Sequence, residues 1–524
     1  MAKKKSEEKE LSYLQMPLTS GQKRQRMTRL SWCGLNRRRV TDTGVLSMEQ
    51  NISTADPPYL IPSQKRKYKE NDNFCGTQDF RRIPLYMYGF GPALIAVYWQ
   101  QDTKTSTNGK IKLDYIADTE SGPYLYTGVL KNGVTETDAK AEPQRCIVKF
   151  NVYDSNVDAA GGTFDEKFLI LPDKYSMNAD LAAIQKDGLD LVPLEPKKTD
   201  NGQENLAAIP DLSYATVHLS RVFGVGKGRI YASHFNNYAD WTLDTADEYN
   251  EANAWCSETQ ANAKAEGDFV GITAFQNHVI CFKRDFMHEI YNNKNPFRVQ
   301  DIYADGCIDN RSIQDVNSRL FFVSRDGVKN YTGKKPEDVG RELGIDRFDK
   351  AVGGSDGRRY YLYCESGGEK HMFVFDTVAG QWAEEGIDGE IVSFAHNQNG
   401  MFALGADGYI YRLDTGEYDH SWAFETDFMT AGSMDIKRVQ KLQLYAEIPQ
   451  GSWMKTYILY GDEQFHPGGS QLVYDSAGRH GMCPVRVLVR KSASYGFKLR
   501  FEGFGYVRLY EMELDLTGGG ELYV

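Results

Sequence analysis

A tight-turn signal that recurs about every 40 residues restricts the possible folds of this chain more than any other feature. Asp326-Gly327, Gly367-Gly368 and Asp407-Gly408 each separate two apolar runs, and a weaker turn lies near Asp285. The turn-to-turn spacings are 41, 41 and 40 residues. Glycine adopts the positive φ that tight hairpins need. A β-rich unit with a period of ~40–45 residues is typical of propeller blades, so the sequence predicts an all-β fold built on a β-propeller.

Similar strand-like runs lie upstream at wider spacing, in 83–100, 145–174 and 220–242. The wider spacing predicts inserted loops at 178–208 and 243–265, and we expect a short helix within 246–264. The glycine-rich GVGKGR (224–229) lies between two strand-like runs and is interpreted as a hairpin turn. Counting units predicts about seven blades, give or take one, in a propeller that spans 31–416.

The 40-residue period stops after Gly416. Five alternating apolar runs follow, separated by Gly, Pro and Asp: RVQKLQLYAEI, MKTYILYGD, PVRVLVRK, GFKLRFEG and YVRLYEMELDLTGGG. Short strands at regular spacing indicate a second all-β unit. We expect a small C-terminal β-sandwich over 417–524.

The first 30 residues are charged and lack apolar periodicity, which predicts an extended basic arm over 1–30. Residues 1–40 hold five Lys and six Arg against three Glu, a charge of +8, so the other 484 residues carry −19 of the total −11. Two interpretations remain open: contact with an acidic partner or DNA, or a solvated tail that is ordered in an assembly. The candidate assembly residues are Lys23, Arg24, Arg26, Arg29, Arg37, Arg38 and Arg39.

Charge and targeting patterns narrow the function classes. An acidic body does not suit general nucleic-acid binding, because sequence-independent affinity comes from neutralising phosphates. The eight cysteines are scattered without a CxxC pair, which favours a reducing, cytoplasmic place of synthesis. The N-terminus lacks the apolar segment of a secretory signal, and no apolar run is long enough to span a bilayer. We therefore expect no membrane insertion.

No motif for catalysis, a cofactor or a metal emerges. The phosphate-binding GxxxxGK[ST], the zinc-binding HExxH and the nucleophile motif GxSxG are absent. Asp154, Asn156, Asp158 and Asp165 resemble the spacing of a calcium loop, but Ala159 replaces the required glycine, so we interpret them as an acidic surface loop. The expectation is a protein without enzymatic activity or cofactor. The one enzyme class that the motif search does not exclude is a paired-carboxylate glycosidase, because its two carboxylates are close in space but not in sequence.

Several segments, taken together in their order, resemble bacteriophage virion proteins of the tail-hub, packaged-DNA-stabilisation and tail-nozzle type. The segments are GLN (34–36) with SMEQNISTADPPYLIP, then RIYASHFNNYADWT, GITAFQNHVICFKRDFMHEIY and GCIDNRSIQDVNSRLFFVSRDGVKNYTG. The resemblance covers about 31–416, although this chain is shorter than the large nozzle proteins and lacks some of their β domains.

The resemblance implies a structural protein of the virion tail. Copies would form a ring, a hexamer by the family pattern, below the portal and adaptor, with genomic DNA passing without sequence recognition. Assembly would take place in the host cytoplasm. The alternative is a tail-tip propeller that binds or cleaves host-surface carbohydrate, which grouped acidic and aromatic residues on one propeller face would favour. A protein-interaction propeller without a virion role is the third possibility.

Overall fold

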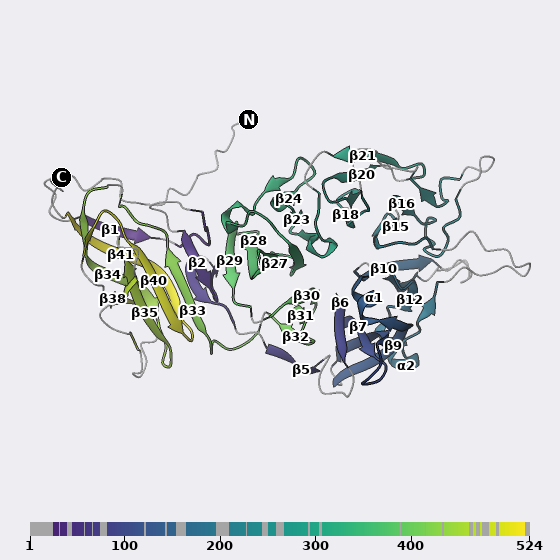
Figure 1. Ribbon diagram of the computed structural model, residues 1–524, viewed down its shortest axis with the longest axis horizontal. Coiled ribbons are helices and arrows are strands. Elements are labelled where there is room, and N and C mark those ends of the chain that lie inside the picture. Colours follow the sequence, from purple (N-terminus) through teal and green to yellow (C-terminus); the bar gives the residue numbers. More distant parts are fainter. Residues whose placement is uncertain are drawn as a thin grey trace, which may run out of the picture.

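The computed structural model describes most of the chain. The described residues are 25–30, 32–38, 45–56, 58–64, 67–73, 81–119, 122–141, 144–153, 164–194, 209–226, 228–243, 250–257, 267–291, 294–302, 306–387, 389–413, 415–431, 434–460, 465–467, 472–473, 481–488 and 492–518. Figure 1 shows two β-rich parts, a ring of small sheets and a sandwich at one side. Within the described ranges, no helix has the length and apolar character needed to cross a membrane.

Within the described ranges, seven four-stranded antiparallel sheets form the ring, which confirms the predicted propeller of about seven blades. Blade 1 consists of β6 (Arg82–Phe90), β7 (Ala93–Gln101), β8 (Asn108–Thr119) and β9 (Gly122–Thr135). Blade 2 consists of β10 (Cys146–Tyr153), β11 (Phe164–Leu171), β12 (Tyr175–Asn178) and β13 (Val192–Pro193). Blade 3 consists of β14 (Tyr214–His218), β15 (Arg221–Gly226), β16 (Arg229–Ala232) and β17 (Trp255–Cys256). Blades 4 and 5 are β18 (Gly271–Phe275), β19 (His278–Phe282), β20 (Met287–Tyr291) and β21 (Arg298–Ile302); and β22 (Gln314–Val316), β23 (Arg319–Ser324), β24 (Gly327–Tyr331) and β25 (Glu337–Asp338). Blades 6 and 7 are β26 (Lys350–Ser355), β27 (Arg359–Ser366), β28 (Glu369–Asp376) and β29 (Gln381–Glu385); and β30 (Ile391–Asn397), β31 (Gly400–Gly405), β32 (Tyr409–Arg412) and β5 (Lys67–Asn73).

The repeated turns occupy one structural position. The turns near Asp285, Asp326, Gly367 and Asp407 all join the second strand of a blade to its third, in blades 4 to 7. Gly367, Gly368 and Gly408 have φ of +58°, +88° and +85°. Gly327 departs from the expectation: it pairs with Ser324 as the first residue of β24, at a φ of +159° close to extended backbone.

Each pair of neighbouring blades shares its own apolar core, because the strands of a blade present side chains to both adjacent sheets. Between blades 5 and 6, for example, Phe321 stacks on Tyr360 with ring centroids 5.0 Å apart. Between blades 7 and 1, Met87 and Phe402 belong to one buried cluster. Corresponding clusters join all seven neighbouring pairs. The ring is therefore closed by packing around its whole circumference.

The ring is also closed by strand pairing. β5 lies some 320 residues upstream of the rest of blade 7, yet it pairs antiparallel with β32, Tyr411 opposite Tyr68. Blade 7 thus combines three strands from the end of the propeller segment with one from its beginning. The sequence did not indicate this, because KYKENDN is polar throughout and has no apolar alternation.

The sandwich differs from the expected domain plan, because both ends of the chain build it. One sheet has the order β3-β4-β41-β34-β38, with β1 on β41 and β39 on β34; the other has β2-β33-β40-β35-β36, with β37 on β35. The strands are β1 (Gln25–Leu30), β2 (Leu46–Gln50), β3 (Ile52–Asp56), β4 (Tyr59–Pro62), β33 (Ser421–Thr426), β34 (Lys437–Glu447), β35 (Trp453–Leu459), β36 (Phe465–Pro467), β37 (Leu472–Val473), β38 (Cys483–Val487), β39 (Ala493–Ser494), β40 (Lys498–Phe504) and β41 (Arg508–Gly518). The prediction that the propeller begins at residue 31 was therefore wrong: its first strand in the chain is β5, and the four strands before it complete the sandwich.

The segment 32–38 ties the two domains together. Trp32 packs in the sandwich core against Phe424, whereas Leu35 is buried in the core between blades 5 and 6. Gly34 lies between them at φ +82°, and a Cβ built there would approach the Cβ of Gln381 to 2.9 Å. Nearby, β2 packs beside β29, and the Glu49 side chain is buried there. The domain boundary is thus a packed interface crossed by the chain.

The inserted segments are only partly as expected. The described part of 178–208 contains α2 (Leu181–Asp187), capped at its N-terminus by Asp180, and β13. Within 246–264, the described residues 250–257 contain strand β17, and the rest of the segment in which a helix is expected lies outside the described residues. GVGKGR forms the predicted hairpin turn between β15 and β16. The remaining helical elements are α1 (Glu136–Ala141), η1 (Asn310–Ser312) and η2 (Arg341–Leu343).

Candidate functional site at the centre of the propeller

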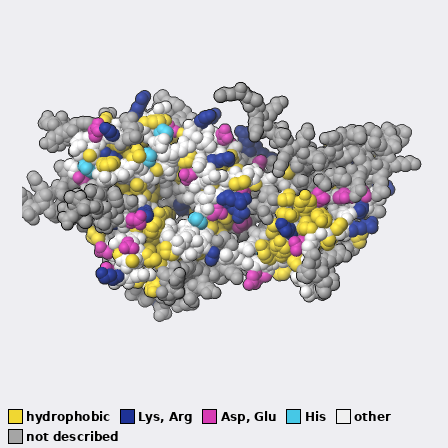
Figure 2. Space-filling model, turned by 180° about the vertical axis from the view of Figure 1, so that it is seen from behind, with side chains coloured by type: hydrophobic (Ala, Val, Ile, Leu, Met, Phe, Trp, Pro, Cys, Tyr) yellow, Lys and Arg dark blue, Asp and Glu magenta, His cyan; other side chains and the backbone are white. Residues whose placement is uncertain are grey.

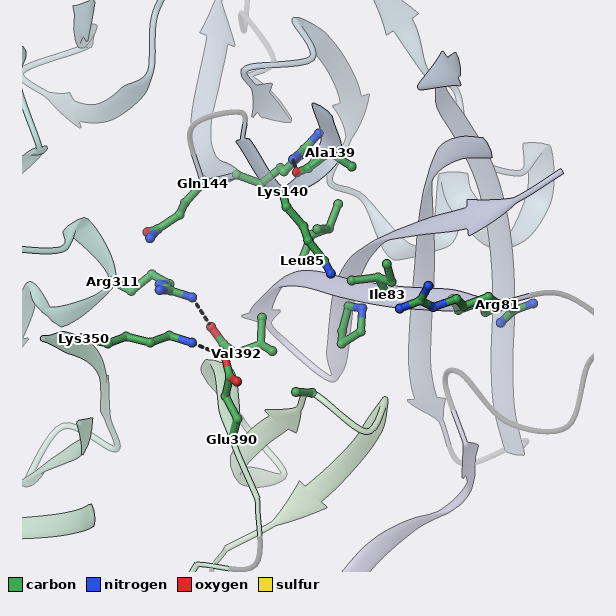
Figure 3. Close-up of a pocket in the computed structure, with 14 residues that line it drawn as sticks. Arg81, Ile83, Leu85, Ala139, Lys140, Gln144, Arg311, Lys350, Glu390 and Val392 are labelled. Atoms are coloured by element: carbon green, nitrogen blue, oxygen red, sulfur yellow. Dashed lines mark hydrogen bonds and ion pairs between the residues drawn. The ribbon is translucent and has the colours of Figure 1, made fainter. Parts of the chain in front are cut away.

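A cavity of about 490 Å³ lies where the first strands of several blades begin. Figure 3 shows its lining side chains surrounding an open space between blades. They come from blades 1, 2, 5, 6 and 7 and from the connections that precede these blades. The lining residues are Arg81, Arg82, Ile83, Pro84, Leu85, Ala139, Lys140, Gln144, Arg145, Arg311, Lys350, Glu390, Val392 and Ala406.

Arg311 is fixed by its neighbours on the blade 5 side. Asp309 caps η1 and also receives hydrogen bonds from Arg311 Nε at 3.1 Å and Nη2 at 2.8 Å. Arg311 Nη1 donates to the carbonyl of Val392 at 2.9 Å, which connects blade 5 to blade 7 across the intervening blade 6. Such a paired guanidinium keeps its planar fork in one orientation. Arg311 is therefore a preorganised cationic group.

Lys350 and Glu390 form an ion pair beside Arg311. Lys350 opens β26 in blade 6, and Glu390 directly precedes β30 in blade 7. The side chains are 25% and 34% exposed, so both remain accessible from the cavity. Glu390 is the single carboxylate among the fourteen lining residues.

The opposite wall, from blades 1 and 2, is also cationic. The Arg145 side chain is only 2% exposed, pairs with Asp173 at 3.3 Å and donates from Nη1 to the carbonyl of Ala139. Lys140 lies above the cavity in Figure 3 and pairs with Glu136 at 2.8 Å. The hydrogen bond from Lys140 lowers the pKa of Glu136, so Glu136 stays ionised as the partner of Lys140.

The composition of the lining limits what the cavity can do. Six of its residues are Lys or Arg, and none of the fourteen is aromatic, His, Cys, Ser or Thr. The lining therefore supplies no nucleophile–base pair for acyl transfer. Elsewhere among the described residues, no cluster of three His, Cys, Asp or Glu could hold a metal ion. The chemistry that the cavity offers is the recognition of negative charge.

The predicted arm residues lie elsewhere, and several contribute to the domain boundary. Lys23, Arg24 and Arg39 lie outside the described residues, as do Asp154, Asn156 and Asp158 of the acidic loop. Arg26 and Arg29, of which only the backbone is described, belong to β1, which pairs with β41, so 25–30 is a strand of the sandwich rather than part of an arm.

Arg37 also departs from the expectation that it meets an acidic group of another subunit. Its Nη2 contacts Glu384 of the same chain at 2.5 Å, and its guanidinium lies 5.3 Å from the ring centre of Phe373. Glu384 Oε1 also accepts a hydrogen bond from His371 Nδ1 at 2.9 Å. Arg38 is exposed, and its N–H donates to Asn36. Arg37 thus fastens the segment 32–38 onto blade 6.

No sequence motif indicates the cationic cavity, because its Lys and Arg residues are spread from 81 to 350. A positional signal was nevertheless present. Arg82 and Lys350 are the first residues of β6 and β26, Arg145 directly precedes β10, and Arg311 precedes β22 by three residues. Equivalent positions of different blades converge at one mouth of a propeller. Aligning the blades by their first strands would have brought these cations together.

Comparison with known proteins finds distant structural similarity and no family match. No protein-family model matches the chain, and no curated protein matches it. Among solved structures, BamB from Moraxella catarrhalis has 10% identity and a TM-score of 0.35, covering 69% of this chain and 99% of its own. The propeller domain of the Trilobed protease from Pyrococcus furiosus has 8% identity and a TM-score of 0.33, with coverages of 66% and 95%. Trypanosoma rangeli sialidase has 10% identity and a TM-score of 0.28, with coverages of 87% and 95%.

Proposed function

We propose that the protein is a structural component of a bacteriophage tail. Copies form a ring below the portal and adaptor, and this ring continues or closes the DNA channel. The proposal starts from the resemblance to tail-hub and tail-nozzle proteins and includes no enzymatic activity and no cofactor. Assembly in the host cytoplasm and residence in the virion belong to the same proposal.

The observation that carries a ring-forming role is an apolar rim on blade 1. Its outer strand β9 pairs only with β8 among the described strands, so its other edge has no strand partner within this part of the chain. Leu125 and Val129 on β9 are 64% and 39% exposed, and Val192 on β13 of blade 2 is 42% exposed. A long open strand edge with exposed apolar residues favours association unless another surface covers it. A neighbouring copy is the cover that we propose.

The sandwich offers a second apolar surface. Figure 2 shows hydrophobic side chains gathered over this part of the molecule. Tyr445 is 37% exposed and packs edge-on against Tyr510, which in turn contacts Tyr59. Tyrosine clusters of this kind are common in protein interfaces. In the proposed ring this surface offers a second contact, because a heterologous ring contact joins two different surfaces of neighbouring copies.

DNA would pass between the copies rather than through a propeller. The propeller centre holds a cavity of about 490 Å³, the size of a small-ligand site, whereas the major groove of a duplex alone is about 12 Å wide. The chain outside 1–40 carries −19. A ring lumen lined by such bodies would repel phosphates, so the genome would slide without sticking.

The ring can be tested by placing charge on the rim. The double variant Leu125→Glu/Val129→Glu should give a folded monomer and abolish the wild-type ring in mass photometry, because two buried carboxylates would oppose the contact. Val378→Glu is the control, since Val378 is 71% exposed in the turn between β28 and β29 of blade 6. A wild-type protein that stays monomeric at all concentrations, or a rim variant that forms the same ring, would contradict the lateral contact.

The virion role needs a separate test. Mass spectrometry and negative-stain microscopy of purified particles should find the protein at ring stoichiometry in the tail. Absence from particles would refute the proposal. The alternative role in carbohydrate binding lacks its expected support in the central cavity, where one carboxylate and no aromatic residue line the wall. Turnover of host polysaccharide by the purified protein, abolished by one Asp or Glu substitution, would favour that alternative.

A further inference from the structure

We propose that the central cavity of the propeller binds a small polyanion, a molecule with at least two carboxylate or phosphate groups. This site goes beyond the role in a tail and does not depend on ring formation. At about 490 Å³ the cavity has the size typical of small-molecule sites. Its walls combine cations with apolar side chains such as Ile83, Leu85 and Val392, as expected for the carbon frame of an organic acid or ester.

The arrangement of charge points to more than one anionic group. Figure 3 shows Arg311 and Lys350 on one side of the cavity and Lys140 on another, so cations face the space from separate blades. Among the described residues, Arg311 pairs with Asp309, Lys350 with Glu390 and Lys140 with Glu136. Cations that face the cavity from separate blades suit a ligand whose anionic groups lie at separate positions.

Hydrogen-bond donors remain available to hold such a ligand. A guanidinium has five N–H donors, and three of those on Arg311 are used by Asp309 and Val392. The Lys350 ammonium has three donors, of which Glu390 takes one. The Oε1 atom of Gln144 is buried without a hydrogen-bond partner among the described residues. Because amide oxygen and nitrogen exchange places by a flip, Gln144 can present its NH₂ group to an anion.

Glu390 pairs with Lys350 as an anionic group of the proposed ligand would. It is the only carboxylate among the fourteen lining residues, and it occupies one donor of Lys350. A bound polyanion would compete with it for Lys350 and would be repelled by it. Removing the charge of Lys350 should therefore lower the ligand affinity, whereas removing the charge of Glu390 should raise it. A purely structural ion pair would not give these opposite effects.

The test measures binding of pyrophosphate and citrate to the full chain by isothermal titration calorimetry at constant ionic strength, with glucose as the uncharged control. Wild type should bind at least one of the two anions saturably and not glucose. Lys350→Gln should weaken binding about ten-fold or more, because a charge-assisted hydrogen bond is lost. Glu390→Gln should tighten binding. Lys498→Gln should leave it unchanged, since Lys498 forms a similar ion pair with Glu425 in the sandwich.

The two anions separate the two possible sources of the charge. A preference for pyrophosphate would identify a phosphorylated ligand, and a preference for citrate an organic acid. Equal losses of affinity in Lys350→Gln and Glu390→Gln would overturn the proposal, because they would assign the pair a structural role only. The absence of saturable binding of both anions to wild type would also overturn it.

Discussion

Glu49 is a carboxylic acid that folding removes from water at the boundary between the two domains. Its side chain is 1% exposed on β2, and β2 packs beside β29. Burial raises the pKa of Glu49 well above its ordinary value of 4.5; a backbone hydrogen bond of Glu384 lowers it by less, and the charge of Glu384 adds to the rise. The folded protein therefore holds this proton more tightly than the unfolded chain does.

Glu49→Gln should stabilise the protein at pH 7–8 relative to wild type. Below pH 4.5 both states of wild type keep the proton, so the pKa shift costs nothing. As the pH rises above 4.5, the unfolded chain ionises first, and wild type loses up to about 1.4 kcal/mol of stability per pH unit until the folded pKa is reached. Urea unfolding between pH 4 and 8 should show a difference that grows with pH. A pH-independent difference would refute this, and Glu337→Gln on exposed β25 is the control.

Gly408 tests the hairpin turns from which the propeller was predicted. It lies at φ +85° between β31 and β32, where an L side chain is strained. Gly408→Val should destabilise the protein by about 1–2 kcal/mol in urea unfolding. Gly389→Val is the matched control, because Gly389 has no positive φ and a Cβ added there would have no heavy atom within 4 Å. Equal effects of both substitutions would contradict the turn argument.

Among the elements, the segment 32–38 and strand β5 connect parts that are distant in the sequence. Trp32 belongs to one core and Leu35 to another, three residues later. The N–H of Leu35 donates to the carbonyl of Trp382 in β29, and the N–H of Arg37 donates to that of Glu342. This short segment therefore couples the sandwich to blades 5 and 6.

Gly34→Ala should weaken that coupling. The new Cβ would lie 2.9 Å from Gln381 Cβ and 3.1 Å from the Trp382 carbonyl oxygen, in addition to the strain of φ +82°. Thermal unfolding followed by calorimetry should separate into two transitions, one per domain. Gly368→Ala has a similar φ of +88° without any atom within 4 Å, so it isolates the backbone strain. A single transition in Gly34→Ala, shifted no more than in Gly368→Ala, would argue against the coupling.

The blades could be predicted from the sequence because their signals are local. A turn glycine and the apolar runs on both sides, as at Gly367-Gly368, fall within about twenty residues, so the turn determines how the two strands pair. β1 to β5 could not be placed in this way. β3 pairs with the neighbouring β4, but the partners of β1, β2, β4 and β5 include β41, β33 and β32, more than 300 residues away, and no local pattern indicates such a pairing. The central cavity was missed for a related reason, since Arg145, Arg311 and Lys350 become neighbours only when the ring closes.

At the scale of the whole molecule, the end of the basic N-terminal segment forms a strand of the sandwich. The predicted arm over 1–30 is shortened at its C-terminal end, because Gln25–Leu30 forms β1 against β41, with Gln25 opposite Leu516 and Leu30 opposite Met512. Any role in assembly is therefore proposed for residues 1–24 alone.

Two truncations should separate the arm from the fold. Deleting residues 1–24 keeps every described strand, so the melting temperature should stay within a degree or so of wild type while incorporation into particles is lost. Deleting residues 1–30 also removes β1 and should lower the melting temperature, by about 2–4 °C for each kcal/mol of lost pairing. Full incorporation of the shorter deletion would leave residues 1–24 without an assembly role.

The strand exchange between the two ends also sets an order of events on the ribosome. β1 to β5 leave the ribosome before the other described strands, yet β5 needs β32, and β1 and β4 need β41, which is made after all the others described. At about 5–20 residues per second, this wait lasts on the order of tens of seconds. During that time blades 1 to 6 and the β3–β4 hairpin can form, but the ring stays open until β32 is made, and β1 stays unpaired until β41 is made. Completion of the last strand therefore acts as a checkpoint, and a prematurely terminated chain cannot present a finished sandwich to an assembling particle.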